Sequence, residues 1–313
     1  MSTRRVLLVS HVRRDEALHA TLETARLLLS EGIHPVMEDS ERDLLGQWAA
    51  AQGLEAQMLG IGCLTVDCHV PELELAIVLG GDGTILKAAE MVRDANTPLL
   101  GINLGHVGFL AESERDELHA SVKRVVAKDY VIRERLTLDV TVEVEGKVVY
   151  STWALNECSV EKSAAEKMLE VLIEVDERPL SSFGADGVVM STPTGSTAYA
   201  FSAGGPVVWP GVEALLLVPL SAHALFSRPL VVAPGSLMAV EVSQASSGNG
   251  VLWCDGRRTT ALPRGARVEV RRSPHSVRLA RFRNSAFTDR LVAKFSLPVT
   301  GWRGAARQRD EVL

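Results

Sequence analysis

Short apolar runs and helical repeats alternate along the first third of the chain. The apolar runs are typical of buried strands, and they lie at residues 6–9, 33–37, 75–79 and 98–103. One helix is predicted after the first run, because apolar residues recur on one face before Gly32, at Leu18, Leu22, Ala25, Leu28 and Leu29. A second helix is expected from about residue 84 to residue 93. Repeated strand–helix units predict a parallel sheet covered by helices, with ligands outside the carboxyl ends of the strands.

The hydrophobic period changes near residue 136. Apolar residues then alternate with polar ones, at Leu136, Leu138, Val140, Val142 and Val144, and residues 145–147 form a turn. Further short strands are predicted at residues 148–153, 168–175, 188–191, 237–242, 251–254, 268–270 and 277–279. Turns rich in Gly, Pro and Asp separate them, which is typical of an antiparallel sandwich.

These two patterns divide the chain near residues 132–137. We assign residues 1–134 to an α/β domain and residues 135–286 to a β-rich domain. Residues 288–297 have helical character, so the segment 287–313 is predicted to return to the first domain. A chain of 313 residues is long enough for two such domains.

Composition narrows the classes of function. The net charge of −6 argues against a general nucleic-acid binder, which normally carries an excess of positive charge. Neither a secretory signal nor an apolar stretch long enough for a bilayer is visible, so a cytoplasmic protein without a membrane partner is predicted. The four cysteines do not form a disulfide framework. Cys63 and Cys68 lie close to His69 but are interpreted as buried or incidental thiols, and no metal site is assigned.

Residues 80–84, Gly-Gly-Asp-Gly-Thr, follow a predicted strand and open a predicted helix. Backbone N–H groups of Gly81, Gly83 and Thr84 at the helix N-terminus favour phosphate oxygens. Asp82 is unusual there, because a carboxylate repels phosphate unless it holds a metal ion or receives a proton. Asp82 is therefore a candidate general base or an aid to Mg²⁺ positioning. Taken alone, the segment fits an ordinary strand–helix turn equally well, and no Walker lysine follows it.

Asn156 and Glu157 end a predicted strand. The amide can donate and accept, and the carboxylate can accept two hydroxyls, so together they can recognise a base edge and a ribose diol. A solvated strand end is the alternative, and it is favoured if these two residues are considered alone.

Two further polar segments flank the strand at residues 188–191. Gly-Ala-Asp-Gly at 184–187 precedes it, and Pro-Thr-Gly-Ser-Thr-Ala-Tyr-Ala at 193–200 follows it. The second segment suits an adenine, with Tyr199 as a stacking surface and Ser196 and Thr197 as polar contacts. A helix N-terminus capped by Ser or Thr is the alternative, and both can hold together. Another glycine-rich loop, residues 101–110, contains His106, which is interpreted as a surface residue.

The order of these motifs resembles the NAD kinase family, and especially its actinobacterial members. GGDGT is followed by INLGHVGFL, then by NE, and then by GADGVVMSTPTGSTAYAFSAGGP. The similarity runs from about residue 4 to residue 302 and includes Asp289-Arg290-Leu291 and the late segment 298–302. Each motif is weak alone, whereas four in the right order and spacing are a strong signal.

The resemblance implies a Rossmann-like first domain, a β-sandwich second domain, and transfer of a phosphoryl group from ATP, or inorganic polyphosphate, to the 2′-hydroxyl of the adenosine ribose of NAD. It implies that Asp82 is catalytic, that a divalent cation, expected to be Mg²⁺, assists, and that the protein is a homodimer or homotetramer. Residues expected to bind nucleotide are Gly81, Gly83, Thr84, Phe109, Asn156, Glu157, Asp186, Ser196, Thr197, Ala198 and Tyr199. Glu157 is expected on the ribose of the adenosine half, and Asp186 towards the nicotinamide end, across a subunit contact.

Some positions differ from the family pattern or have no assigned role. Cys158 stands where many relatives carry an aliphatic residue, and both types pack as small hydrophobes. His223 lies in a variable part of the pattern and is given no role. Nine arginines occur between Arg257 and Arg283. They could contact phosphates, but an exposed strand face is the favoured interpretation.

Three other classes share part of this pattern. Diacylglycerol and sphingosine kinases have the GGDGT turn, but a different second glycine-rich motif is expected for them. The 6-phosphofructokinases have the turn without the β-rich second half. A non-catalytic NAD(H)-binding regulator would keep the adenine loop but could dispense with Asp82, so the carboxylate favours an enzyme.

Overall fold

The computed structural model describes residues 3–105, 108–164, 167–282 and 286–299. It separates into two compact units. The first unit comprises Met1–Arg133 and Arg278–Leu313, and the second unit comprises Glu134–Val277. His106 and Arg283 lie outside the described residues.

The first unit contains an eight-stranded sheet in the order β3-β2-β1-β4-β5-β20-β7, with β6 beside β5. The pairs among β1 to β6 are parallel, and β20 is parallel to β5. The strands are β1 (Arg5–Ser10), β2 (His34–Met37), β3 (Gly62–Cys63), β4 (Leu75–Leu79), β5 (Leu99–Asn103), β6 (Ser113–Glu114), β7 (Val131–Arg135) and β20 (Val277–Arg281). This sheet bears out the parallel arrangement predicted for the first third of the chain.

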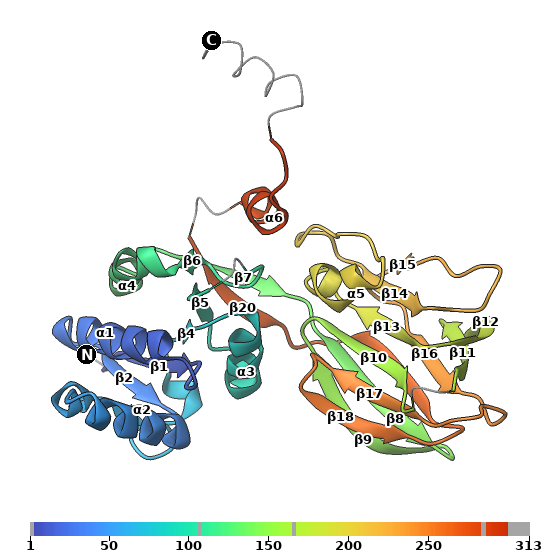
Figure 1. Ribbon diagram of the computed structural model, residues 1–313, viewed down its shortest axis with the longest axis horizontal. Coiled ribbons are helices and arrows are strands. Elements are labelled where there is room, and N and C mark those ends of the chain that lie inside the picture. The colour runs from blue at the N-terminus through green and yellow to red at the C-terminus, as the bar shows by residue number, and fades with distance from the viewer. Residues whose placement is uncertain (1–2, 106–107, 165–166, 283–285, 300–313) are drawn as a thin grey trace, which may run out of the picture. The chain divides into compact units, whose positions relative to one another are not determined.

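Helices cover both faces of this sheet. They are α1 (Asp15–Ser30), α2 (Asp39–Ala51), α3 (Asp82–Val92) and α4 (Leu118–Val126), with short 3₁₀ turns η1 (Glu55–Met58), η2 (Val70–Glu72), η3 (Arg93–Ala95) and η4 (Arg115–Glu117). A further helix, α6 (Phe287–Phe295), follows β20 and contacts Phe109 in the loop after β5. Val6 and Leu8 of β1 share one core cluster with apolar residues of α1, α2 and α4. Ile85 of α3 instead lies against Gly101 of β5, on the other side of the sheet. Figure 1 shows α1 to α4 around the strands of the first unit.

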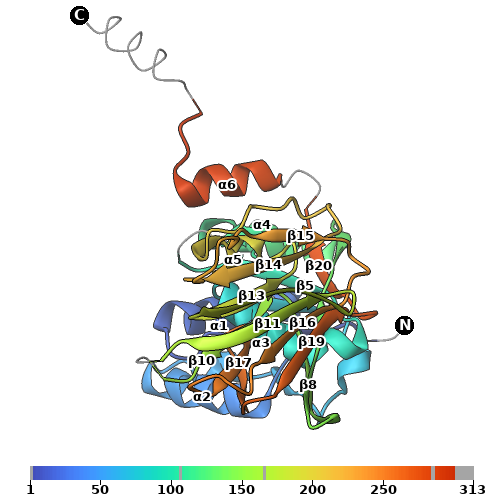
Figure 2. The ribbon, with the colours of Figure 1, turned by 90° about the vertical axis from the view of Figure 1, so that its right-hand side faces the viewer.

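The second unit contains two six-stranded antiparallel sheets, in the orders β15-β14-β13-β10-β17-β18 and β12-β11-β16-β19-β8-β9. The strands are β8 (Leu138–Val144), β9 (Lys147–Ala154), β10 (Glu157–Lys162), β11 (Leu169–Val175), β12 (Arg178–Ala185), β13 (Gly187–Ser191), β14 (Leu215–Leu220), β15 (Leu230–Val232), β16 (Met238–Val242), β17 (Gly250–Cys254), β18 (Arg258–Leu262) and β19 (Arg267–Arg272). Figure 2 looks onto strands of both sheets, including β13 and β11.

One apolar core joins the two sheets of the second unit. It contains Val140 and Val142 of β8, whose alternation revealed the strand, together with Val160 of β10 and Val188 of β13. Side chains from the inner faces of two stacked sheets form such a core in a β-sandwich. The short turn η5 (Gly195–Thr197) and helix α5 (Tyr199–Ser202) follow β13.

One strand lies in a different sheet from the one predicted. Residues 277–279 were expected in the antiparallel sandwich, whereas β20 pairs with β5 of the first unit, where Leu279 is opposite Leu99. Val277, Leu279, Ala280 and Arg281 are all buried, which is the pattern of a strand in a sheet that is covered on both faces. In the part of the chain that the structure describes, no helix combines the length and apolar character needed to cross a bilayer.

Candidate functional site

The turn at residues 80–84 opens helix α3. Strand β4 is buried throughout and ends at Leu79, and α3 begins at Asp82 with Gly81 as its N-cap residue. A side chain added at Gly81 or Gly83 would meet nothing within 4 Å, so a ligand can approach the backbone of this turn closely. Thr84 is buried and its N–H donates to the Gly81 carbonyl at 2.9 Å. The N-terminus of an 11-residue helix thus faces open space, which favours an anion.

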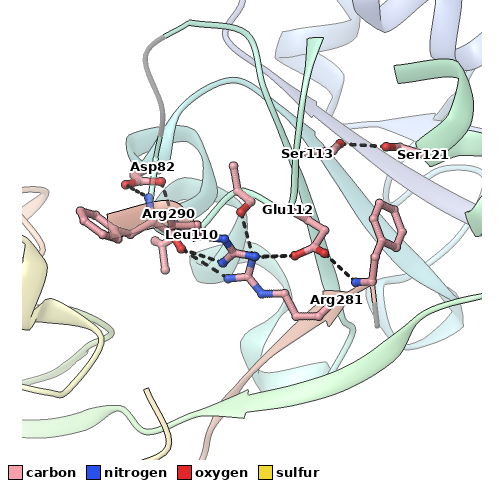
Figure 3. A network of polar contacts seen from close by, with 10 residues as sticks. Asp82, Leu110, Glu112, Ser113, Ser121, Arg281 and Arg290 are labelled. Carbon is pink, nitrogen blue, oxygen red and sulfur yellow. Dashed lines mark hydrogen bonds and ion pairs between the residues drawn. The ribbon is translucent and has the colours of Figure 1, made fainter. Parts of the chain in front are cut away.

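Asp82 joins this turn to the second glycine-rich loop. Its two carboxylate oxygens accept hydrogen bonds from the backbone N–H groups of Phe109 and Leu110, both at 3.1 Å (Figure 3). A side chain on Gly108 would lie 2.4 Å from the carboxylate, so only glycine permits this approach. Asp82 remains partly exposed. The structure therefore holds this carboxylate in one orientation without covering it.

The ring of Phe109 is directed away from open space. Phe109 is buried, and its ring centre lies 6.0 Å from that of Phe287 and 5.9 Å from that of Phe295, both on α6. Its backbone, rather than its ring, is what the turn at Asp82 contacts.

Asn156 lies between β9 and β10 of the second unit and Glu157 begins β10, and Asp255 fixes the backbone of both. The Asp255 carboxylate accepts the N–H groups of Leu155 at 2.9 Å, Asn156 at 2.7 Å and Glu157 at 3.3 Å. Arg258 donates to the same carboxylate at 2.8 Å. Asp255 was not among the predicted site residues, because an Asp-Gly pair such as residues 255–256 is common in turns.

Burial changes the protonation of two neighbouring carboxyls. Desolvation, together with the charge of Asp255, raises the pKa of Glu157 to about 8, against the opposing effect of a hydrogen bond from the Tyr199 backbone. Desolvation also raises the pKa of Asp255, against the effect of its backbone hydrogen bonds and Arg258. One oxygen of Glu157 is buried without a hydrogen-bond partner within the described residues. A ligand hydroxyl or amide would satisfy that oxygen.

Glu157 and Tyr199 line the same cavity. Its volume is about 310 Å³, and it is lined by Glu157, Ser159, Glu161, Tyr199, Trp253, Asp255 and Gly256. Tyr199 is 37% exposed, so its ring is accessible. Two residues from separate motifs, 156–157 and 193–200, thus meet at one cavity of the second unit.

The loop at residues 193–200 is anchored by its own hydroxyls. The Ser196 hydroxyl is fully buried, donates to the Pro193 carbonyl at 2.7 Å and accepts the N–H of Val208 at 2.9 Å. Thr197 donates to the Thr194 carbonyl at 3.3 Å. Neither hydroxyl caps a helix, since the N-cap residues of η5 and α5 are Thr194 and Ala198, without side-chain caps.

Gly195 locks the same loop against the Asn156 turn. A side chain on Gly195 would lie 2.0 Å from the Asn156 carbonyl oxygen, so only glycine allows this contact. The two motifs that contain Gly195 and Asn156 therefore pack directly against each other.

Asp186 does not line that cavity. It lies between β12 and β13 and pairs with Lys162 at 2.6 Å. The hydrogen bond from Lys162 holds the pKa of the Asp186 carboxyl below its usual value, and Ser221 contributes in the same direction. Nearby, the N–H of His223 donates to the Gly184 carbonyl at 2.8 Å.

The arginines of the late basic run do not form one exposed strand face. Arg267 pairs with Glu174 and Glu269, and Arg272 pairs with Glu213. Arg281 is buried and pairs with Glu112. The interpretation was wrong for Arg281, because sequence alone did not show that β20 enters the sheet of the first unit.

The cysteines are buried thiols. Cys63 donates to Asp39 at 3.3 Å, and burial is the largest cause of its raised pKa. Cys158 is fully buried opposite Cys254 on β17. Within the described residues, no group of three or more His, Cys, Asp or Glu side chains could hold a metal ion.

Comparisons with known proteins place these motifs in one family. The ATP-NAD kinase N-terminal domain matches residues 6–130, and the ATP-NAD kinase C-terminal domain matches residues 155–282. The NAD kinase of Leifsonia xyli subsp. xyli is 62% identical over 302 residues, 96% of this chain and 97% of the relative. The chain belongs to the NAD kinase family. NAD kinase 2 of Streptomyces coelicolor is 55% identical over 303 residues, again 96% of this chain and 97% of the relative.

Solved structures of the family share the fold. The crystal structure of yeast NADH kinase complexed with NADH has a TM-score of 0.82 at 21% identity, covering 96% of this chain and 89% of that one. An NAD kinase from Archaeoglobus fulgidus in complex with ATP has a TM-score of 0.67 at 21% identity, covering 94% of this chain and 100% of that one. These likenesses confirm the predicted Rossmann-like and β-sandwich architecture.

Family membership confirms the predicted activity. NAD kinases phosphorylate NAD and so produce NADP, and this chain is an enzyme of that kind. Diacylglycerol and sphingosine kinases and 6-phosphofructokinases share the glycine-rich turn, but the chain belongs to neither class. It is also not a non-catalytic NAD(H)-binding regulator.

Proposed function

We propose that Asp82 is the carboxylate that takes the proton from the 2′-hydroxyl of the adenosine ribose of NAD during phosphoryl transfer. The supporting observation is that two backbone N–H groups orient Asp82 while it stays partly exposed. The ribose oxygen forms a bond to the γ-phosphorus of ATP, the bond to the departing ADP oxygen breaks, and the hydroxyl proton passes to Asp82. A base in this role must lie within hydrogen-bond reach of the hydroxyl.

The donor phosphates are proposed to lie at the N-terminus of α3. Open space at Gly81 and Gly83 allows phosphate oxygens to reach the backbone N–H groups there, and Thr84 continues the same turn. Inorganic polyphosphate presents the same chain of phosphoryl groups, so we include it as a possible donor.

A divalent cation, Mg²⁺, fits this chemistry. Mg²⁺ is commonly held by one or two carboxylates together with substrate phosphates and water, rather than by a protein cage. The described residues contain no such cage, and Asp82 is a carboxylate at the proposed phosphate site. The ion would offset the charge of the donor phosphates.

The second unit is proposed to bind NAD through the cavity at Glu157. The unpartnered Glu157 oxygen supports a hydrogen bond to ribose, Asn156 lies beside it, and Tyr199 offers an accessible ring. Ser196, Thr197 and Ala198 are proposed to shape the adenine side of that loop, Ser196 through the backbone that its hydroxyl fastens. Phe109 is assigned to the site through its backbone.

The remaining assignments are also proposals. Asp186, which lies between β12 and β13 and pairs with Lys162, is proposed to reach the nicotinamide end across a subunit contact, in a homodimer or homotetramer. We propose two domains with a boundary near residue 134, and we place the return of the chain to the first domain at β20 rather than at residue 287, because β20 pairs with β5. The buried thiols and the acidic net charge support a cytoplasmic protein that binds neither nucleic acid nor membrane.

The decisive experiment is an assay of NADP formation. Purified protein is incubated with NAD, Mg²⁺ and either ATP or polyphosphate, beside the Asp82→Asn variant. Product from the wild type and a greatly reduced rate in the variant would support the role of Asp82. Equal rates for both proteins would remove Asp82 from catalysis, and product with ATP alone would remove polyphosphate as a donor.

A further inference from the structure

The peptide unit between Phe109 and Leu110 is held from both ends (Figure 3). Its N–H, which belongs to Leu110, donates to Asp82 at 3.1 Å. Its carbonyl, which belongs to Phe109, accepts from Arg290 at 3.2 Å and from Arg281 at 3.5 Å. The N–H and C=O of a planar trans peptide point in opposite directions. A single rigid group therefore links the arginines to the candidate catalytic carboxylate.

Glu112 brings the two arginines together. Its carboxylate is 1% exposed and pairs with Arg281 at 2.9 Å and with Arg290 at 2.8 Å. It also accepts the N–H of Phe282 at 2.7 Å. One buried carboxylate thus offsets the repulsion between two cations and ties β20 to α6 at the loop.

Helix α6 contacts the loop in a second way. Phe287 and Phe295 of this helix lie on either side of Arg290 in sequence, and both rings lie about 6 Å from the Phe109 ring. Arg290 itself is 14% exposed. Helix α6 therefore contacts Phe109 twice. The Arg290 guanidinium binds its carbonyl, and the two phenylalanine rings pack against its side chain.

We propose that Arg290 is a positioning residue that orients Asp82 through the Phe109–Leu110 peptide. This inference rests on the proposed role of Asp82 as the base. Without Arg290 the peptide is less restrained, its N–H no longer fixes the carboxylate, and Asp82 samples rotamers from which the ribose hydroxyl is out of reach. Misplacement of the Asp82 carboxylate in this way should reduce turnover strongly and affect the affinity for NAD much less.

The first variant is Arg290→Met, which keeps an unbranched stem and leaves Glu112 paired with Arg281. Its kcat for NADP formation should fall about tenfold, with the KM for NAD within about twofold of the wild type. Arg290→Lys keeps the charge but cannot reach both Phe109 and Glu112 as a fork does, so its kcat should be intermediate. The lysine variant also serves if the methionine variant folds poorly.

Arg115→Met is the matched control. It removes an arginine–glutamate pair of similar length, Arg115 with Glu23 at 2.9 Å, in the same unit. Its kcat should remain at the wild-type value. A comparable loss of kcat in Arg115→Met would mean that the effect is a general consequence of losing an ion pair, which would overturn the inference.

A double-mutant cycle separates positioning from a merely structural role. In the Asp82→Asn background, Arg290→Met should change the residual kcat less than about twofold, because its effect passes through the carboxylate. An equal fold-loss in both backgrounds, or an unchanged kcat in Arg290→Met, would overturn the inference. If Asp82→Asn alone keeps the wild-type kcat, the proposed role of Asp82 is wrong and the inference fails with it. If only Arg290→Met is unimpaired, the role of Asp82 stands and the inference alone is wrong.

Discussion

Asp82 in the first unit and Asp255 in the second are both oriented by backbone N–H groups, but they differ in exposure. Each carboxylate accepts backbone N–H groups from a separate segment, residues 109–110 for Asp82 and residues 155–157 for Asp255. Asp255 is buried and also pairs with Arg258, whereas Asp82 remains partly exposed.

This difference is what we expect between Asp82, which we propose as the reactive carboxylate, and Asp255, which supports the backbone of a turn. Asp255 is buried, and its hydrogen bonds fix the backbone of residues 155–157, of which Glu157 lines the cavity. Asp82 is fixed but accessible, so it can exchange a proton with a ligand. Hydrogen bonds to backbone N–H groups alone therefore do not identify a catalytic aspartate, and exposure is what distinguishes the two.

The largest effect is expected from replacing Asp82, the proposed reactive carboxylate, by Asn. The kcat for NADP formation should fall by a factor of about 10² to 10⁴, because the variant cannot accept the hydroxyl proton. The dissociation constant for NAD, measured by calorimetry, should change little. Asp116→Asn, at an exposed position of η4, is the control and should keep full activity. A strong loss of NAD affinity in Asp82→Asn would make Asp82 a binding residue instead.

The raised pKa of Glu157, the neighbour of Asp255, predicts that the stability of the protein depends on pH. Its pKa is raised from 4.5 to about 8 in the folded protein. Between these values the unfolded chain releases the proton and the folded protein keeps it, so the free energy of unfolding falls as the pH rises, by up to about 1.4 kcal/mol per pH unit. Glu157→Gln should remove this contribution in urea unfolding at pH 5, 6.5 and 8, chosen as roughly even steps across that window.

The exposed turn residue Glu177 provides a control for that series. Glu177→Gln should reproduce the wild-type dependence of stability on pH. Parallel profiles for the wild type and Glu157→Gln would show that Glu157 is ionised throughout this window, contrary to its burial.

Asp255→Asn should destabilise the second unit by about 2 kcal/mol, because Arg258 loses its buried partner and three backbone N–H groups lose a charged acceptor. NAD binding should weaken as the turn at residues 155–157 loosens. Asp176→Asn, at an exposed turn where the carboxylate accepts the N–H of Leu237, should destabilise less. Urea unfolding and NAD titration check both variants. Unchanged stability with full NAD affinity would contradict the supporting role.

Ser196→Ala carries the smallest expected effect. The free energy of unfolding should fall by about 1 kcal/mol, because the buried N–H of Val208 loses its acceptor. Thr197→Ala removes one longer hydrogen bond, at 3.3 Å, and should have less effect. If Ser196→Ala weakens NAD binding without any loss of stability, the hydroxyl contacts the ligand instead of fastening the loop.

The sequence predicted the parts of the fold that have a clear hydrophobic period. The strand at residues 75–79 and the alternation from Leu138 to Val144 appear as predicted. The sheet to which residues 277–281 belong could not be predicted, because a short apolar run is compatible with either sheet, and tertiary pairing decides. Long-range partners such as Glu112 with Arg281 and Arg290 have no local signal at all.

For the candidate site, motifs identified segments but not the orientation of side chains. Ser196 and Phe109 belong to segments of the expected kind, yet one hydroxyl is buried in the loop and one ring packs on α6. Asp255 was missed because an Asp-Gly pair is common in turns. Its raised pKa and three N–H contacts are visible only once strands β9, β10 and β17 are assembled.

The position of β20 has a consequence for how the enzyme is made. This strand lies between β5 and β7 in the first sheet, although the entire second unit separates it from them in the sequence. On the ribosome, β5 and β7 are translated long before β20, so the growing chain exposes an unfinished sheet edge while the second unit emerges. We therefore expect the second unit to fold first during synthesis, and the first unit to acquire its full sheet only when translation has passed Arg281.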